Sequence, residues 1–428
     1  MNQEQKTFYM NRNIRLFPTI LALTWDVLLI WTISTLYFTT QKGLSYSQVI
    51  MLDSILMMFG CLFCIPVSKI FQKVGSVASS KILLVGYAAF LLICIYGTQY
   101  WHFVIAHAFL AFGYAVGSIK VNPILVNSLA VVNRQQDYQK IYGRGMAILY
   151  VLEAVGAVGV SFIYSFNPTL AIWFSVGFVV LCEILLCFVK EPEKFKDVQS
   201  TEQKQVSPDG YLKILKSSFF ICLLVYIFFF RGIVSIASSS FKVYLQQITD
   251  HGTIQVWAFG IIFAGTKICA ALSSKYQFKM DYHYGLKSLI IFCSLLILSF
   301  VVTGVVYVIN PYSAISVVVI ILFSYILGAL RIPNQIFVNN YMQFCMPEKN
   351  IERAYAIRTT VEYLGYALMS FLYATLMSVF CDNYGLTNLV YIGITFIPLV
   401  VALIFFIRAL TKRYAKKKTI IKKEYSDD

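Results

Sequence analysis

Two apolar stretches of this chain carry the same acidic residue three positions before the same glycine. Aligned with each other, LEAVGAVGVSFIY and VEYLGYALMSFLY pair Glu153 with Glu362 and Gly156 with Gly365. An acid held in apolar surroundings can take up and release a proton, and intramembrane acids commonly mark ion or substrate paths. The glycine lies on the same helical face, where its small size allows another helix to approach. We therefore predict Glu153 and Glu362 as proton-coupling residues.

Each of the two acids also has a structural alternative, which is an ion pair. Arg358 lies four residues before Glu362 on the same helical face, so a local pair explains Glu362 equally well. Leu149 occupies the matching position before Glu153, so a partner of Glu153 must come from another helix. Lys267 also lies in an apolar stretch, close to a basic loop. Its charge is explained by a side chain that extends to the membrane surface at least as well as by a functional role.

A third acid, Asp26, and a cation, Arg231, lie near the middles of two further apolar stretches. Opposite charges that face each other across a cavity can close on each other or be separated by a solute. A carboxyl group whose surroundings change in this way also changes its proton affinity. We predict that Asp26 couples protons and that Arg231 binds substrate, and a permanent bridge between them is the alternative.

Lys120 and Arg331 form a second pair of intramembrane charges. Each precedes a proline in its apolar stretch, Pro123 or Pro333. Proline removes a backbone donor and frees carbonyl groups that a cavity or a neighbour must satisfy. Cations beside such discontinuities mark central sites in transporters, so we predict Lys120 and Arg331 as substrate-binding residues. The alternative for Lys120 is a side chain that extends toward the cytoplasm.

The elements that position these residues are membrane helices. The 428-residue chain is 59% hydrophobic and 13% charged, whereas soluble domains carry roughly 25% charged residues. Helices satisfy their own backbone hydrogen bonds and need about 20 apolar residues to cross a bilayer. We predict twelve such spans in an all-α membrane protein. They lie near 16–40, 46–71, 82–100, 102–128, 142–165, 168–189, 217–244, 253–274, 286–309, 312–343, 355–380 and 386–410.

The twelve spans form two similar halves. Besides the acidic motif, NPILVN at 122–127 matches NQIFVN at 334–339, in the same order along the chain. Parallel repeats of six spans are an established transporter plan, with the solute site between them. We predict a pseudo-symmetric arrangement of an N-terminal six-helix bundle (1–189), a cytoplasmic linker (190–216) and a C-terminal six-helix bundle with a basic tail (217–428).

The positive charges predict the orientation of the spans. The formal net charge is +15, and most of the 35 Lys and Arg residues lie in alternate connections. The exceptions are Lys42, Lys120, Arg231, Lys242, Lys267 and Arg331. This bias places both termini in the cytoplasm of a multi-pass protein of the cell membrane, and it explains the charge without nucleic acid.

The loop after the second span, CIPVSKIFQKVGS, resembles the signature I-P-x-G-x-x-x-D-R-x-G-R of the major facilitator superfamily. Pro66 and Gly75 match, Lys73 stands for the arginine, and Gln72 replaces the acid. The resemblance implies two six-helix bundles that rock around a central solute site. The family acid helps to latch the cytoplasmic side closed, and this chain lacks it.

A narrower resemblance concerns the fourth and fifth spans. GYAVGSIKVNP and GMAILYVLEAVG are similar to the G-x-G-G-I-K-P-N and G-F-x-I-F-Y-x-x-x-N-x-G elements of proton-coupled oligopeptide transporters. The E-x-x-E-R element of those proteins is absent from the first span, which has LTWDVLLIW. The similarity therefore bears on Lys120 and not on the whole site.

These observations predict a secondary active transporter that works by alternating access and is driven by protons, with sodium left open. Because intramembrane cations outnumber the deep acids, the solute is expected to be anionic or zwitterionic, such as an organic acid, an amino-acid derivative or a peptide. One alternative is a proton-linked exporter of drugs or other amphipathic compounds, although the usual span-four arginine and the span-five glycine–proline element are missing. Another is a membrane sensor that transports nothing.

No pattern in the sequence predicts an enzyme, a cofactor or a metal site. The four histidines are scattered, and no nucleotide-binding loop or Ser/His/Asp arrangement occurs. Cys61 and Cys64 form a C-x-x-C on an apolar stretch without other ligands, which favours packing residues. The expected partners are the solute, a coupling ion and the lipid bilayer, and the expected state is a monomer.

Overall fold

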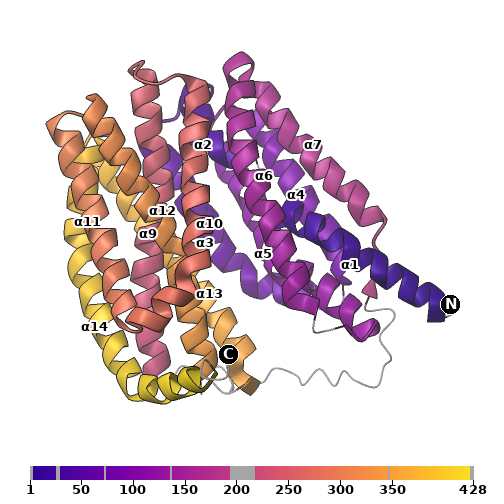
Figure 1. Cartoon of the computed structure of the whole chain (residues 1–428). Coiled ribbons are helices and arrows are strands. Elements are labelled where there is room, and N and C mark those ends of the chain that lie inside the picture. The colour runs from indigo at the N-terminus through magenta and orange to yellow at the C-terminus, as the bar shows by residue number, and fades with distance from the viewer. Residues whose placement is uncertain are drawn as a thin grey trace. The chain divides into compact units, whose positions relative to one another are not determined.

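Long helices form nearly all of the chain that the computed structural model describes, which is residues 3–25, 29–71, 74–134, 137–192, 217–345 and 348–424. Their apolar composition explains this, because a backbone in hydrocarbon must pair its own polar groups. The helices are α1 (Gln3–Trp25), α2 (Ile30–Thr40), α3 (Tyr46–Ile70), α4 (Ser76–Tyr96), α5 (Tyr100–Val131), α6 (Tyr138–Phe166), α7 (Pro168–Cys187), α9 (Ser218–Asp250), α10 (Val256–Tyr284), α11 (Lys287–Ile309), α12 (Ala314–Cys345), α13 (Glu348–Val379) and α14 (Tyr384–Glu424) (Figure 1).

Most of these helices are long and apolar enough to cross a membrane. Among the described residues, eleven candidate spans meet this condition, and the first of them runs from Glu4 to Thr40 through α1 and α2. The predicted span at 355–380 lies in α13, which has 32 residues and is therefore about 48 Å long. Its tyrosines and Glu362 make it less apolar than its neighbours. The described residues contain no strand, and the predicted all-α fold is confirmed.

The chain divides into two compact units. The first contains residues 1–203 and 245–268, and the second contains 204–244 and 269–428. The end of α9 and the first half of α10 thus belong with the N-terminal helices. The predicted linker at 190–216 lies almost wholly outside the described residues, so the predicted boundary between two six-helix bundles stays a prediction.

In the first unit, α4 packs on α5, α5 on α3, and α1 on α6. Small residues make close approach possible: a Cβ atom at Gly113 of α5 would lie 2.5 Å from the ring of Tyr87 in α4. Tyr87 is fully buried and donates through its hydroxyl to the Thr24 carbonyl of α1, at 3.1 Å. The core is therefore built from apolar side chains and tyrosines whose hydroxyls bond to backbone carbonyls.

In the second unit, α11 packs on both α12 and α14. Buried aromatic rings fill its core, and Tyr226 of α9 stacks on Phe406 of α14 with ring centroids 5.0 Å apart. Polar groups inside this core pair with each other: Tyr373 donates to Asn388 at 2.7 Å, and Asn388 donates to Thr303 at 3.2 Å. This network ties α11, α13 and α14 together.

Candidate functional site

A cluster of ion pairs lies inside the second unit, where α9 meets α13. Arg231 of α9 donates from Nε to Glu362 Oε1 at 2.7 Å, and a second nitrogen of the same guanidinium contacts the same oxygen. Arg358, one turn before Glu362 on α13, binds the other carboxylate oxygen at 2.8 Å. The three side chains are 9%, 16% and 6% exposed for Arg231, Glu362 and Arg358. Glu362 therefore holds two nearly buried arginines.

Arg331 of α12 adds a third guanidinium to this region. Its backbone carbonyl accepts a hydrogen bond from Arg231 at 3.3 Å, so the two residues are adjacent. The Arg331 residue itself is exposed. The region thus combines three arginines with one carboxylate and keeps two net positive charges. An arrangement of this kind can bind a carboxylate or phosphate group through paired N–H donors.

The glycine of the repeated motif explains how this cluster is positioned. A Cβ atom at Gly365 would lie 2.5 Å from the Phe228 carbonyl oxygen, and one at Gly232 would lie 2.8 Å from the Gly365 carbonyl oxygen. The backbones of α9 and α13 therefore touch at these two glycines. Because Arg231 precedes Gly232 and Glu362 precedes Gly365 by one turn, this contact brings their side chains together.

The first copy of the motif has different surroundings inside the first unit. Glu153 of α6 pairs with Lys267 of α10 at 3.3 Å, and their side chains are 15% and 31% exposed. The expectation that Glu153 finds its partner on another helix is thus confirmed. A Cβ atom at Gly156 would approach only the tip of the Leu29 side chain, at 2.7 Å. Close packing of α6 on α10 occurs instead at Gly260, against Ala157 and Ser161.

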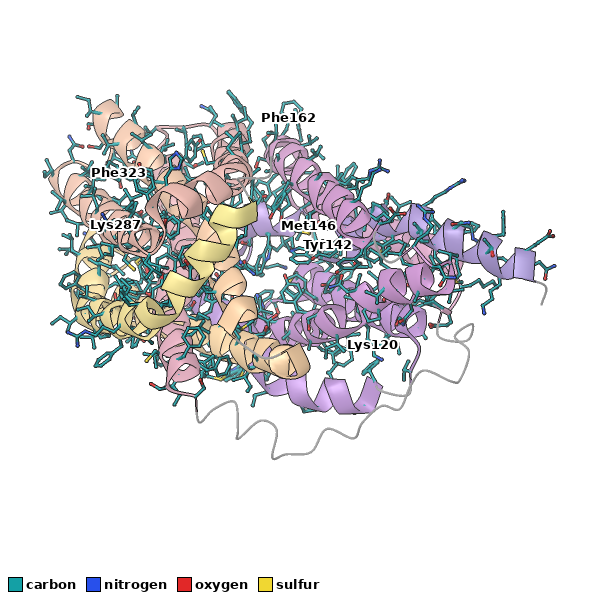
Figure 2. The ribbon with its side chains drawn as sticks, turned by 60° about the horizontal axis from the view of Figure 1, so that its bottom comes forward. Lys120, Tyr142, Met146, Phe162, Lys287 and Phe323 are labelled. Atoms are coloured by element: carbon teal, nitrogen blue, oxygen red, sulfur yellow. The ribbon has the colours of Figure 1, made fainter. Side chains whose placement is uncertain are left out.

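Lys120 contacts the loop between α3 and α4. Its Nζ donates to the Val74 carbonyl at 3.1 Å, and Figure 2 labels it on α5. Lys120 therefore supports a loop backbone in this structure, and its predicted role in substrate binding stays a prediction. Figure 2 also labels Tyr142 and Met146, which lie one turn apart on α6.

The loop that resembles the family signature is held by an acid from elsewhere in the chain. Pro66 is exposed within α3, and Gly75 is the residue before α4. Glu191, which follows α7, accepts hydrogen bonds from Val77 N at 3.2 Å and Ala78 N at 2.7 Å. Its carboxylate lies against Gly75, where a Cβ atom would collide with it. No local sequence signal indicated this residue, which lies more than a hundred positions from the loop.

Two predicted site residues, Asp26 and Lys73, lie outside the described residues. Arg231 binds Glu362, and the predicted pair between Asp26 and Arg231 remains a prediction. Within the described part of the chain, no group of three or more His, Cys, Asp or Glu side chains is arranged to hold a metal ion.

Comparisons with known proteins agree with this architecture. The structure is similar to that of the nucleoside transporter NupG, with 11% identity and a TM-score of 0.74 over 95% of this chain and 99% of that chain. It is also similar to a bacterial homolog of the human lysosomal transporter Spinster in an inward-facing, unoccupied conformation, with 14% identity and a TM-score of 0.62 over 97% of this chain and 98% of that chain. At these identities the likeness concerns the fold alone.

Sequence comparison gives the family. No curated protein sequence matches the chain. The sequence model of the Major Facilitator Superfamily matches residues 16–370, which is most of the chain. This chain therefore belongs to the major facilitator superfamily of membrane transporters.

Proposed function

We propose that this chain is a secondary active transporter that moves a small anionic or zwitterionic solute by alternating access, driven by a proton gradient. The observation that carries the proposal is the pair of arginines, Arg231 and Arg358, on the single carboxylate of Glu362, with Arg331 next to Arg231 through its backbone carbonyl. Organic acids, amino-acid derivatives and peptides are the solute classes that this charge favours.

The surplus of positive charge is costly unless something compensates it. A charged side chain at the centre of a bilayer costs about 2.5–3.5 kcal/mol on insertion scales. Arginine stays protonated and presents its donors in a fixed fork that fits carboxylate and phosphate groups. Glu362 compensates one guanidinium, so an anionic group on the solute is a suitable counter-ion for another. Arg331, which is exposed, is the member of the cluster best able to accept it.

The ion pair between Glu153 and Lys267 supports the proposed coupling to protons. The pair joins two membrane helices, and its lysine side chain is 31% exposed. Protonation of Glu153 would remove its charge and break one ion pair, with Lys267. Protonation of Glu362 would break two ion pairs, with Arg231 and Arg358, so Glu153 is the better candidate for the proton site. Asp26 remains the second candidate for the proton site, by the sequence argument alone.

Uptake into vesicles tests the solute class. We expect the purified full chain, reconstituted into sealed liposomes, to accumulate one or more labelled carboxylic acids, amino-acid derivatives or short peptides when the interior is more alkaline than the exterior. Nucleosides belong in the same panel, because the structurally similar protein NupG is a nucleoside transporter. Exclusive transport of uncharged or cationic solutes would contradict the proposed class, and export of amphipathic cations would favour the drug-exporter alternative.

Two acid variants test the coupling. We expect Glu153→Gln and Asp26→Asn each to reduce gradient-driven accumulation of the solute. Solute counterflow should be unchanged in both variants, because it needs no net proton movement. Glu183→Gln is the matched control, because Glu183 makes only a 3.8 Å contact with Lys81 and is 40% exposed. If both test variants keep gradient-driven accumulation at the control level, neither residue is the coupling site. If accumulation requires a sodium gradient and no pH difference, the coupling ion is sodium and not the proton.

The proposal includes a monomer in the cell membrane with both termini in the cytoplasm. Two exposed free cysteines offer a test, because Cys187 ends α7 and Cys381 follows α13. Six spans precede Cys187 and eleven precede Cys381, so we expect them on opposite sides. In intact cells, a membrane-impermeant thiol reagent should label Cys381 and leave Cys187 unlabelled until the membrane is opened. The reverse pattern would invert the orientation.

A further inference from the structure

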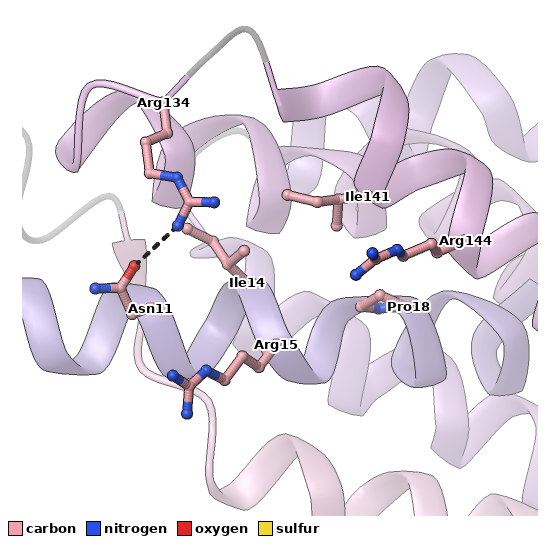
Figure 3. A pocket seen from close by; sticks show the side chains of 7 residues that line it. All are labelled: Asn11, Ile14, Arg15, Pro18, Arg134, Ile141 and Arg144. Atoms are coloured by element: carbon pink, nitrogen blue, oxygen red, sulfur yellow. Dashed lines mark hydrogen bonds between the residues drawn. The ribbon is translucent and has the colours of Figure 1, made fainter.

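A polar pocket lies in the first unit, between residues 11–18 of α1 and residues 134–144, which lead into α6 and form its start. Its volume is about 400 Å³, within the range of about 300–1,000 Å³ that is typical of small-molecule sites. Figure 3 shows the side chains of Arg134 and Arg144 extending toward α1, with Ile14 and Ile141 between them (Figure 3). The lining residues are Asn11, Ile14, Arg15, Pro18, Arg134, Ile141 and Arg144.

The charge of this pocket is one-sided. Three arginines line it, and no carboxylate does. Arg134 is partly neutralised by Asp137, at 2.6 Å, and it also contacts the Asn11 side chain at 3.5 Å. Within the part of the chain that the structure describes, no acid pairs with Arg15 or Arg144, and both are exposed. Two guanidiniums of the pocket are therefore without a protein counter-ion there.

Membrane orientation explains only part of this arrangement. The positive-inside bias accounts for basic residues at this end of the helices. It does not require three of them to border one cavity or all three to be arginines. Arginine differs from lysine in its planar set of donors, which matches the oxygens of phosphate in pairs. Ile14, Pro18 and Ile141 add apolar walls to the cavity.

We propose that this pocket binds the phosphate group of an anionic ligand. Arg15 and Arg144 supply the charge-assisted hydrogen bonds, and Arg134 is held in position by Asp137 and Asn11. The phosphate can belong to the headgroup of an anionic phospholipid or to a free phosphorylated solute, because both present the same oxygens. The site is separate from the arginine cluster around Glu362, so it does not depend on the proposed transport function.

Ligand-induced stabilisation of the purified full chain tests the proposal and separates the two sources. The probes are inorganic phosphate and a short-chain phosphatidylglycerol, with a short-chain phosphatidylcholine as the neutral comparison, each titrated at constant ionic strength. A ligand that binds the folded state raises the melting temperature, and the rise grows with the logarithm of the ratio of ligand concentration to Kd. Stabilisation by phosphate indicates a site open to free phosphorylated solutes. Stabilisation by phosphatidylglycerol alone indicates a headgroup site.

Matched variants assign the effect to the pocket. In R15Q/R144Q we expect the apparent affinity for the stabilising probe to fall about tenfold or more, because each charge-assisted hydrogen bond contributes about that much. K6Q/K140Q is the control, because it removes the same charge from the same two helices at residues that do not line the pocket. Stabilisation by neither anionic probe, equal affinity in R15Q/R144Q, or an equal loss in K6Q/K140Q would each overturn the proposal.

A conservative variant covers the case in which R15Q/R144Q does not fold. R15K/R144K keeps both charges but loses the paired donors, so we expect its affinity for the probe to lie between those of the wild type and R15Q/R144Q. If it binds as tightly as the wild type, the contact is a general attraction between charges and the pocket is not a phosphate site.

Discussion

Glu153 and Glu362 occupy the same position in two copies of one sequence motif, yet their surroundings differ. Glu362 binds two arginines, one from α9 and one from its own helix, and all three side chains are nearly buried. Glu153, which is as buried as Glu362, binds one lysine from α10, and only this lysine is more exposed. Each acid thus takes one cation from the facing helix, and the second cation of Glu362 comes from its own helix, where the first copy has Leu149 instead.

The glycine of the motif shows the same difference. Gly365 is in backbone contact with α9, whereas Gly156 approaches only a leucine side chain. Backbone contact fixes the distance between two helices more tightly than contact with a flexible side chain does. In the first copy, the backbone contact of α6 with α10 lies elsewhere, at Ala157 and Gly260, so each copy has a backbone contact with its facing helix.

Removal of the two acids should have the largest and most unequal effect. Glu362→Gln leaves two buried arginines without their carboxylate, and breaking a buried pair in this way costs about 3–5 kcal/mol. Glu153→Gln removes a single pair whose lysine is 31% exposed, so we expect a smaller loss, of about 1 kcal/mol. The measurement is the melting temperature of each variant purified in detergent, with Glu183→Gln as the exposed control. Equal losses from the two variants would show that both copies serve the same structural role.

Methyl groups added at the glycines should give the next largest difference. A Cβ atom at Gly365 would press on the Phe228 backbone, and overpacking of this kind costs about 1–3 kcal/mol. Gly156→Ala displaces only the end of Leu29 and gains helix propensity, so its effect should be close to zero. Gly159→Ala, with no atom within 4 Å of the new methyl group, is the control and should stabilise. The order of melting temperatures checks this, and a Gly365→Ala protein as stable as Gly159→Ala would contradict the close contact.

The sequence was sufficient to predict the all-helical membrane fold. Long apolar stretches can satisfy their backbones only as helices, so composition limits the fold strongly. The same reasoning predicted that Glu362 has a cation one turn away and that Glu153 does not, because helix periodicity determines which residues share a face. Both expectations follow from local spacing.

The partners across helices could not be predicted in this way. Lys267 was assigned to the membrane surface with at least equal weight, but it pairs with Glu153, 114 positions earlier in the chain. Glu191 follows α7, and its carboxylate accepts hydrogen bonds from the first turn of α4, which supplies an acid near a loop whose own signature lacks one. Such contacts depend on how the helices are rotated against each other, and spacing along one helix carries no information on that rotation.

Lys120 and Arg331 extend the comparison to the substrate. Lys120 donates to the Val74 carbonyl, whereas Arg331 is exposed beside the cluster of arginines. We expect Arg331→Gln to raise the KM for an anionic solute about tenfold, the amount that the loss of one charge-assisted hydrogen bond gives. Lys120→Gln should change KM less than about threefold, by the same scale. The measurement is solute uptake by equal amounts of each reconstituted protein. If Lys120→Gln raises KM more than Arg331→Gln does, Lys120 belongs to the substrate site.

The smallest expected effect concerns the first turns of α4 and α11. Each is the third membrane span of its predicted half, because α1 and α2 together form one span. In α4 the Glu191 carboxylate accepts from the amides of Val77 and Ala78, whereas Leu286, the residue before α11, makes no side-chain cap. A carboxylate at a helix N-terminus contributes about 0.3–1 kcal/mol through its charge. Glu191→Gln should therefore speed hydrogen exchange at Val77 and Ala78 about two- to fivefold. The first turn of α11 should exchange at its wild-type rate, and so should both helices in the control Glu183→Gln. Unchanged exchange at Val77 and Ala78 would mean that Gly75 and the loop backbone hold this end of α4 without the acid.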